Sequence, residues 1–398
     1  MSNSAERRLR ILQSISDVPA SRWDACANPP GRAFNPFLSH SFLRALENSQ
    51  SVGQGTGWQP FHLVLEELSA NGNQDVFGVV PLYLKGHSQG EYVFDYAWAD
   101  AWNRAGQNYY PKLQCSVPFT PATGRRLLVR EDQDCERAQV QLVSGALKVA
   151  EEMDVSSLHF TFLTESQWQT LGSMGLLQRM DQQYHWENQN YADFEEFENA
   201  LTSKKRKNIR RERTQAVEND IVIEKLTGSD IQEQHWDAFF EFYMDTGSRK
   251  WGTPYLARQF FSLVSETMAD HILLVMCKRR GRYIAGALNF IGSETLYGRN
   301  WGCNEYHRFL HFELCYYQAI EFAIARGLKF VEAGAQGAHK IARGYVPKAT
   351  YSAHWIKDES FRAAVAHYLD EERGYVRDDI AQLSQHIPFK RTAPESEV

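Results

Sequence analysis

The sequence lacks the features that would place the chain in a membrane, outside the cell or on bulk nucleic acid. No apolar run approaches the roughly 18 residues that cross a bilayer as a helix, and residues 1–8 lack the apolar core of a secretion signal. The six cysteines include no Cys-x-x-Cys pair, which is typical of buried thiols in a reducing compartment. A formal net charge of −6 argues against general affinity for nucleic acid, although a local basic patch stays possible. We therefore expect a cytoplasmic protein without a membrane span.

The length and the order of the expected elements indicate two domains. A chain of 398 residues exceeds one compact core, and 43% hydrophobic with 23% charged residues is typical of a globular protein. Each half is predicted to contain two helices, a three-strand meander, a helix and a strand. We place the domains at residues 1–190 and 218–398, joined by a basic connecting helix at 191–217. The predicted class is α+β.

The periodicity and the turn signals predict the individual elements. The first half is expected to have strands at 61–65, 75–84 and 91–95, an aromatic loop at 96–112, a helix at 133–152 and strands at 157–163 and 182–187. One long helix is expected at 193–217. The second half is expected to have a strand at 221–225, helices at 232–243 and 255–268, strands at 272–277, 284–290 and 295–302, an amphipathic helix at 311–326 and a strand at 328–331.

The glycine-rich segment 332–345 is the expected active site. Its small residues let the backbone approach a ligand closely, and its polar residues are Glu332, Gln336, His339, Lys340 and Arg343. Glu332, His339 or the helix-start residue Glu313 could act as a general base towards an amine. The alternatives are a helix-end charge for Glu313 and an ion pair of Glu332 with a nearby cation.

A basic run at 203–213 contains seven cations and one acid, Glu212. Two interpretations have equal weight: a site for the phosphates of a nucleic acid, a nucleotide or a lipid-linked precursor, and an ordinary solvated helix face. The expected anion-binding residues are Lys204, Lys205, Arg206, Lys207, Arg210 and Arg211.

Two short motifs suggest other chemistry. Residues 86–90 match the Gly-x-Ser-x-Gly elbow of serine hydrolases, with Ser88 as the nucleophile, but the elbow needs a following helix and a strand is expected there. His307 and His311 are four residues apart, as two metal ligands on one helix face would be, but no His-Glu-x-x-His accompanies them. A hairpin turn and a protein without metal are the preferred interpretations.

Longer motifs resemble the FemAB-like proteins, which are associated with peptidoglycan biosynthesis and GNAT-type acyl transfer. In the second half they are Ser203-Lys-Lys-Arg-Lys-Asn-Ile-Arg-Arg211, Leu310-His-Phe-Glu-Leu-Cys-Tyr-Tyr-Gln318 and Glu332-Ala-Gly-Ala-Gln-Gly-Ala-His-Lys340. In the first half they are Lys85-Gly-His-Ser-Gln-Gly-Glu-Tyr-Val-Phe-Asp95, Asn108-Tyr-Tyr-Pro-Lys112 and Val117-Pro-Phe-Thr-Pro-Ala122. The resemblance implies two tandem GNAT-like (Fem-type) domains, each a mixed, mostly antiparallel sheet flanked by helices.

The resemblance also implies a set of substrate-binding residues. Arg299 to Asn304 is similar to the loop with which GNAT enzymes hold the pyrophosphate of acyl-CoA, but it ends on asparagine where they have glycine or alanine. The expected substrate-binding residues are Lys85, His87, Tyr109, Tyr110, Lys112, Arg299, Trp301, Gln336, Lys340 and Arg343.

Three functions follow from these observations. The leading hypothesis is an N-acyltransferase that passes an acyl group from acyl-CoA, or an aminoacyl group from aminoacyl-tRNA, to a small-molecule amine or peptide linked to cell-wall precursors. No metal is expected. The alternatives are a non-catalytic double-GNAT module that binds an anion and, third, a serine hydrolase that uses Ser88.

Overall fold

The computed structural model describes residues 6–68, 74–250, 254–335 and 337–390. The chain forms two compact units that interleave along the sequence. Unit 1 comprises residues 1–181, 255–268 and 350–376, and unit 2 comprises 182–254, 269–349 and 377–398. The three-part division of the chain at residues 190 and 217 stays a prediction.

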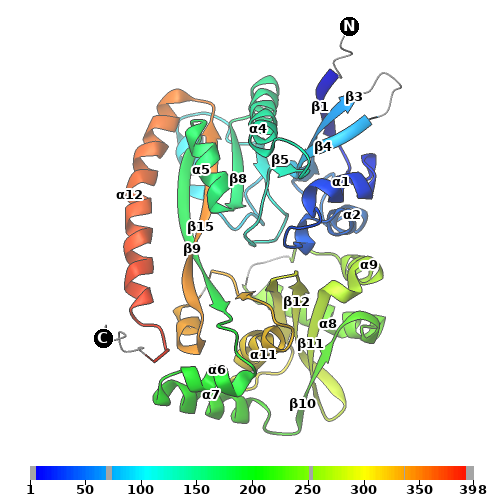
Figure 1. Ribbon diagram of the computed structural model, residues 1–398, viewed down its shortest axis with the longest axis vertical. Coiled ribbons are helices and arrows are strands. Elements are labelled where there is room, and N and C mark those ends of the chain that lie inside the picture. The colour runs from blue at the N-terminus through cyan, green and yellow to red at the C-terminus, as the bar shows by residue number, and fades with distance from the viewer. Residues whose placement is uncertain (1–5, 69–73, 251–253, 336, 391–398) are drawn as a thin grey trace. The chain divides into compact units, whose positions relative to one another are not determined.

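Unit 1 contains helices and two groups of strands (Figure 1). Its helices are α1 (Ala20–Ala27), α2 (His40–Asn48), α3 (Tyr96–Arg104), α4 (Cys135–Glu152), α5 (Glu165–Ser173) and α9 (Arg258–Met268), with short 3₁₀ turns η1 (Ile15–Asp17) and η2 (Pro36–Leu38). A four-stranded sheet has the order β1 (Glu6–Leu12), β3 (His62–Leu68), β4 (Gln74–Val80), β7 (Leu128–Val129). The other strands have the order β15 (Val346–Ile356), β8 (Ser157–Leu163), β6 (Lys112–Cys115), β5 (Leu82–Lys85), β2 (Trp58–Pro60).

Unit 2 has strands in the order β10 (Ile221–Leu226), β11 (Ile272–Arg279), β12 (Arg282–Ile291), β13 (Thr295–Cys303), β14 (Phe330–Glu332), β9 (Leu177–Glu187). All neighbouring pairs are antiparallel except β13 with β14. The helices are α6 (Phe194–Ala200), α7 (Ser203–Ala216), α8 (Glu233–Lys250), α10 (Leu310–Phe312), the π-helical η5 (Glu313–Tyr317) and α11 (Gln318–Ala325), with 3₁₀ turns η3 (Gly228–Asp230), η4 (Ala269–His271) and η6 (Ala338–Arg343). Strands β9 and β15 and helix α12 (Glu359–Ser384) each have residues in both units.

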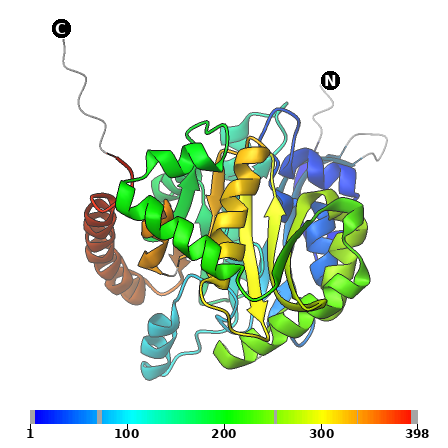
Figure 2. The same cartoon turned by 90° about the horizontal axis from the view of Figure 1, so that it is seen from below.

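The second half of the chain folds largely as its periodicity predicts. The meander β11–β12–β13 and the helix at 311–326 are confirmed, and Ala319, Ile320 and Ala323 of the apolar stripe are fully buried. Gly327 ends that helix at φ +64°, the left-handed region that glycine enters easily. Figure 2 shows α11, in yellow-orange, against the yellow strands of unit 2, as its contacts with β13 and β14 require.

Four predictions about the first half and its connection are wrong. The strand at 75–84 is two strands that belong to different sheets, because Pro81 has no N–H to continue a ladder. Residues 91–95 form no strand, since their acidic side chains turn inwards to a lysine, and the aromatic loop begins with helix α3. The helix at 193–217 is α6 and α7, separated where Leu201 bridges to Phe389.

A pair of glycines lets helix α8 lie directly on the sheet of unit 2. Gly286 and Gly302 face each other across β12 and β13. A Cβ at Gly302 would lie 2.2 Å from the carbonyl oxygen of Phe242, whereas one at Gly286 would meet the side-chain ends of Met276 and Phe239 at 2.8 and 2.9 Å.

Gly302→Ala is therefore expected to lower the free energy of unfolding by about 1–3 kcal/mol, because a backbone carbonyl cannot move aside. Gly286→Ala serves as the control and should cost less, since flexible side chains can yield. Urea denaturation of both variants measures the difference, and equal losses would contradict this account of the packing.

The part of the chain that the structure describes contains no helix that is both long enough and apolar enough to cross a bilayer.

Candidate functional site

The glycine-rich segment of unit 2 begins where the short strand β14 ends. This strand runs parallel to β13 and antiparallel to β9, with Glu332 opposite Tyr297 and His185. After Glu332 the chain turns at Gly334, Gly337 and Gly344, which have φ of +76°, +97° and +93°. Side chains other than glycine rarely adopt such backbone angles, so these positions require glycine.

Lys340 holds this turn closed from inside. Its ammonium group donates to the carbonyl oxygens of Ala333 at 2.5 Å and Gly334 at 2.9 Å, and only 3% of the residue is exposed. Burial lowers the pKa of Lys340 to about 8. The lysine therefore orders the backbone on which any substrate of this segment would rest.

His339 is the exposed titratable side chain of the turn. Its Nε2 atom lies 3.2 Å from the hydroxyl of Tyr316, and its ring packs against Phe312 at 5.3 Å between centroids. A Cβ at Gly337 would lie 2.2 Å from its Cε1 atom, so the glycine makes room for the ring. Partial burial, followed by the nearby Arg343 and Lys340, lowers the pKa of His339 below 6.5. The imidazole is thus neutral at pH 7 and able to accept a proton.

The other polar residues of the segment are placed differently. Arg343 donates to Glu212 at 2.8 Å and to the carbonyl of His339 at 2.8 Å, and its guanidinium covers the ring of Phe312 at 3.5 Å. Glu332 is buried at the end of β14. Gln336 lies outside the described residues. The roles of Arg343, Glu332 and Gln336 towards a substrate stay predictions.

Glu313 belongs to an internal ion cluster. Arg213 of α7 contacts its carboxylate at 3.1 Å and also contacts Glu321 at 2.7 Å, and Gln318 donates to Glu313 at 2.7 Å. Burial raises the pKa of Glu313, against the opposing effect of Arg213. With 2% of the residue exposed, this geometry favours a structural charge that ties α7 to η5.

Arg299 and Trp301 lie within strand β13, so the expected pyrophosphate loop at 299–304 is wrong. The loop that follows carries Glu305, which accepts from Arg279 at 2.9 Å and lies 3.2 Å from His307. A carboxylate there would repel a pyrophosphate, so these residues do not fit the loop that holds coenzyme A in GNAT enzymes. A cavity of about 320 Å³ is lined by Thr246, Trp301, Cys303, Glu305, Tyr306, His307, Leu310 and His311.

His307 and His311 both line this cavity, but each has another neighbour. His307 lies against Glu305, while the ring of His311 packs on Trp301 at 5.2 Å. Among the described residues, no group of three or more His, Cys, Asp or Glu side chains could hold a metal ion.

The basic helix α7 is only partly neutralised. Arg210 pairs with Glu198 of α6 at 2.7 Å, and Arg206 donates to Asn199 at 3.1 Å. Within the described ranges, no ion pair or hydrogen bond engages the side chains of Lys204, Lys205, Lys207 and Arg211. Lys204, Lys207 and Arg211 are exposed, and their spacing of three and four residues puts them on one stripe.

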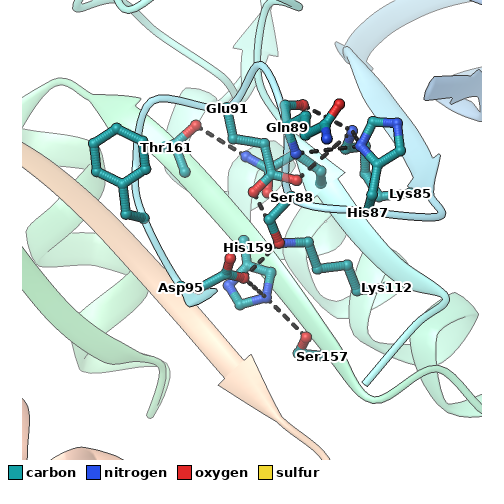
Figure 3. Close-up of polar contacts among 12 residues, drawn as sticks. Lys85, His87, Ser88, Gln89, Glu91, Asp95, Lys112, Ser157, His159 and Thr161 are labelled. Carbon is teal, nitrogen blue, oxygen red and sulfur yellow. Dashed lines mark hydrogen bonds and ion pairs between the residues drawn. The ribbon is translucent and has the colours of Figure 1, made fainter. Parts of the chain in front are cut away.

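Unit 1 contains a buried ionic cluster that we define as Lys85, Ser88, Glu91, Asp95 and Lys112 (Figure 3). The ammonium group of Lys112 donates to Ser88 at 2.9 Å, to Glu91 at 2.8 Å and to Asp95. Lys85 lies 3.8 Å from Glu91, with its ammonium 3.6 Å above the ring of Trp58. No member is more than 4% exposed. Burying ions costs several kcal/mol each unless they are paired as here.

The cluster continues through hydrogen bonds into a pair of histidines. Tyr109 donates to Asp95 at 2.7 Å and lies 3.4 Å from His159. The Nδ1 atoms of His159 and His354 are 2.6 Å apart, so one proton lies between two imidazoles. Burial lowers the pKa of His159 to about 3 and that of His354 well below 6.5. Both histidines are therefore neutral.

The two carboxyl groups of the cluster differ in pKa. Burial raises the pKa of Glu91 to about 7, with Lys112 opposing the shift. It would also raise the pKa of Asp95, but Lys112 and His159 outweigh burial and lower it. Burial likewise lowers the pKa of Lys85 to about 7. Asp95 is thus a fixed anion, whereas Glu91 and Lys85 can change charge near neutral pH.

The raised pKa of Glu91 predicts a pH dependence of stability. Between pH about 4.5, its ordinary value, and about 7, the folded protein keeps a proton that the unfolded chain has lost. This contribution is fully present below pH 4.5 and is lost as the pH rises to 7. The contribution of Glu91 is the free energy of unfolding of the wild type minus that of Glu91→Gln. This difference should therefore fall as the pH rises from about 4.5 to about 7. A difference that stays flat would contradict the assignment.

Ser88 does not form a nucleophile elbow. No helix follows residues 86–90, and the hydroxyl lies 2.8 Å from that of Tyr110 and accepts from the charged Lys112. The adjacent residue in the sequence, His87, has its Nε2 atom 3.0 Å from the carbonyl of Thr56. The geometry gives Ser88 no base, and it argues against the serine hydrolase.

The structure brings the expected residues Lys85, His87, Tyr109, Tyr110 and Lys112 together in unit 1, mostly buried. Sequence reasoning missed their partners Glu91 and Asp95. The sequence signal that could have predicted them is the position of these two acids between Lys85 and Lys112 in a stretch rich in aromatic residues.

The comparisons with known proteins agree with this fold. The FemAB-like family, described as acting in peptidoglycan biosynthesis or recognition, matches residues 14–391. The structure of FemX is 12% identical, covers 88% of this chain and 98% of its own, and has a TM-score of 0.53. A conserved protein of unknown function from Bacteroides thetaiotaomicron is 10% identical, covers 88% of this chain and 100% of its own, and has a TM-score of 0.52. No curated protein matches the sequence.

These findings define an α+β protein with the Fem-type fold, as the sequence predicts, while the GNAT-like character of its two domains stays a prediction. The chain belongs to the FemAB-like family, since the family match extends over most of its length. Membership supports a transferase related to peptidoglycan.

Proposed function

We propose that the protein transfers an acyl or aminoacyl group directly to the amine of a small molecule or peptide related to cell-wall precursors. The observation that carries the proposal is the neutral, exposed imidazole of His339, set in a turn whose backbone Lys340 holds in place. A base that is unprotonated at neutral pH is what an amine nucleophile needs.

The reaction needs no covalent enzyme intermediate. The amine nitrogen attacks the carbonyl carbon of the donor, and a new C–N bond forms as the bond to the leaving group breaks. With the Nε2 proton of His339 directed to Tyr316, Nδ1 takes the proton of the amine and returns it to the leaving thiolate or ribose oxygen. In this proposal, backbone N–H groups of the turn stabilise the oxyanion.

A thermal-shift panel tests the proposal. Purified protein is heated with acetyl-CoA, longer acyl-CoAs, charged tRNA and UDP-linked muropeptide, because a ligand that binds the native state raises the Tm. A shift with one donor and with the muropeptide is expected, and His339→Ala should keep both shifts because it removes the base and leaves the turn intact. No shift with any compound would contradict the proposal.

The second candidate is a binding module for anions, which is favoured by the cations of α7 that have no partner among the described residues. Replacing Lys204, Lys207 and Arg211 together by glutamate should weaken binding of inorganic polyphosphate by roughly tenfold or more at low salt, since binding scales with the charges neutralised. Arg210→Gln is the control, because Arg210 already forms an ion pair with Glu198. Unchanged affinity in the triple variant would identify α7 as an ordinary solvated face.

A further inference from the structure

We propose that unit 1 carries a second proton-transfer centre, in which hydrogen bonds connect the buried carboxyl group of Glu91 through Lys112 and Ser88 to the hydroxyl of Tyr110. Its ligand is a protonated amine whose N–H meets Tyr110. The inference goes beyond the proposed function, because it requires neither His339 nor an acyl donor.

The distances make a continuous path. Glu91 Oε2 accepts from Lys112 Nζ at 2.8 Å, Lys112 Nζ donates to Ser88 Oγ at 2.9 Å, and Ser88 Oγ lies 2.8 Å from Tyr110 Oη. Glu91 is 4% exposed and Ser88 3%, whereas Tyr110 is only half-buried. The path therefore leads from an interior acid to a side chain that is partly exposed.

The charges around Glu91 make it the acceptor at the inner end. Asp95 and Lys112 hold each other ionised, and Lys85 faces the second oxygen of Glu91, Oε1, at 3.8 Å. Within the described residues Oε1 accepts no hydrogen bond, so no donor hydrogen-bonded to this oxygen holds Glu91 as the anion. The other titratable groups nearby are His87, Tyr96, Tyr109, Tyr110 and His159, and burial lowers the pKa of both histidines and raises that of the three tyrosines.

Proton transfer along this path balances without a further reactant. Lys112 passes the proton of its hydrogen bond to Glu91, turns its freed lone pair towards Ser88 and takes the Ser88 proton, and Ser88 then takes the proton of Tyr110. The ligand, bound as an ammonium ion, then gives one proton to the Tyr110 oxygen and remains as the neutral amine, so that Glu91 gains the proton that the ligand loses. The exposed Tyr96 adjoins this end, because its hydroxyl donates to the Ser88 carbonyl at 3.5 Å, and the exposed ring of Phe94 stacks on Tyr96 at 6.0 Å. Their ring faces suit an ammonium group.

Carbon-13 NMR of the full chain, labelled at the carboxyl carbon of glutamate and at the phenol carbon of tyrosine, tests the inference. In the wild type, the Tyr110 signal should follow the titration of Glu91 near neutral pH, and added ethanolamine should shift both signals. In Ser88→Ala, ethanolamine should shift Tyr110 alone, and the Tyr110 signal should no longer follow Glu91. Ser157→Ala is the control. It removes a hydroxyl that is hydrogen-bonded to His159 and does not belong to the path, so it should behave as the wild type.

A second variant guards against misfolding of Ser88→Ala. Tyr110→Phe leaves the buried cluster intact, and ethanolamine should then no longer shift the Glu91 signal. Coupling that survives in Ser88→Ala, or a wild type in which ethanolamine moves neither signal, would overturn the inference. Because none of these readouts uses acyl transfer, the inference and the proposed function can fail separately.

Discussion

Lys112→Met is expected to lower the free energy of unfolding by about 3–5 kcal/mol, because removing one partner of a buried ion pair leaves an uncompensated charge. Lys112 is fully buried and donates hydrogen bonds to Ser88, Glu91 and Asp95. Methionine fills the space of the aliphatic stem but donates no hydrogen bond. Urea denaturation measures the loss as a lower midpoint.

Lys148→Met is the matched control in the same unit. Lys148 is 76% exposed and lies 3.7 Å from Glu152 one turn along α4, a geometry in which an ion pair contributes little. Its replacement should change the free energy of unfolding by less than about 0.5 kcal/mol. A similar loss in both variants would show that the buried cluster contributes nothing special to stability.

His339→Ala is expected to lower kcat for acyl transfer by about 10²–10⁴-fold while KM changes little, because a general base acts on the transition state and not on binding. The wild-type rate should also depend on pH. The pKa of His339 lies below 6.5. The rate should rise as the pH increases through this pKa, because the imidazole then loses its proton. The variant should lack this rise.

His307→Ala is the control for a histidine of unit 2 outside the turn, where His307 lies against Glu305. Initial rates of amide formation over a pH series compare the three proteins. If His339→Ala keeps the wild-type rate and pH profile, the base is another residue, and the burial of Glu332 and Glu313 leaves neither as an exposed substitute.

The sequence was most informative where one face of an element is buried and the other is polar. The meander β11–β13 and the helix through α11 have this property, and Gly327 marks the helix end because few other residues adopt its backbone angle. The sequence was least informative where polar residues are internal. Glu91 and Asp95 look like solvent-facing acids of a strand, yet Lys112 draws both inwards from a strand some 20 residues away.

The candidate sites show the same limit. Local composition was enough to single out residues 332–345, because glycines, a histidine and cations in sequence do not depend on distant contacts. Local composition could not show that Arg213 forms an ion pair with Glu313, or that Arg299 and Trp301 lie inside a strand. Both facts depend on residues far along the chain. Long-range pairing therefore decided which of the expected residues are exposed.

Amide formation, measured by mass spectrometry, tests the central claim most directly. Wild-type protein and His339→Ala are incubated with the donor that raises the Tm and with a muropeptide amine, and the acceptor is analysed for the mass of the acyl or aminoacyl group. We expect the added mass with the wild type and at least about a hundredfold less with the variant. An acceptor that stays unmodified with the wild type, although donor and acceptor both bind, would contradict acyl transfer and leave a binding protein.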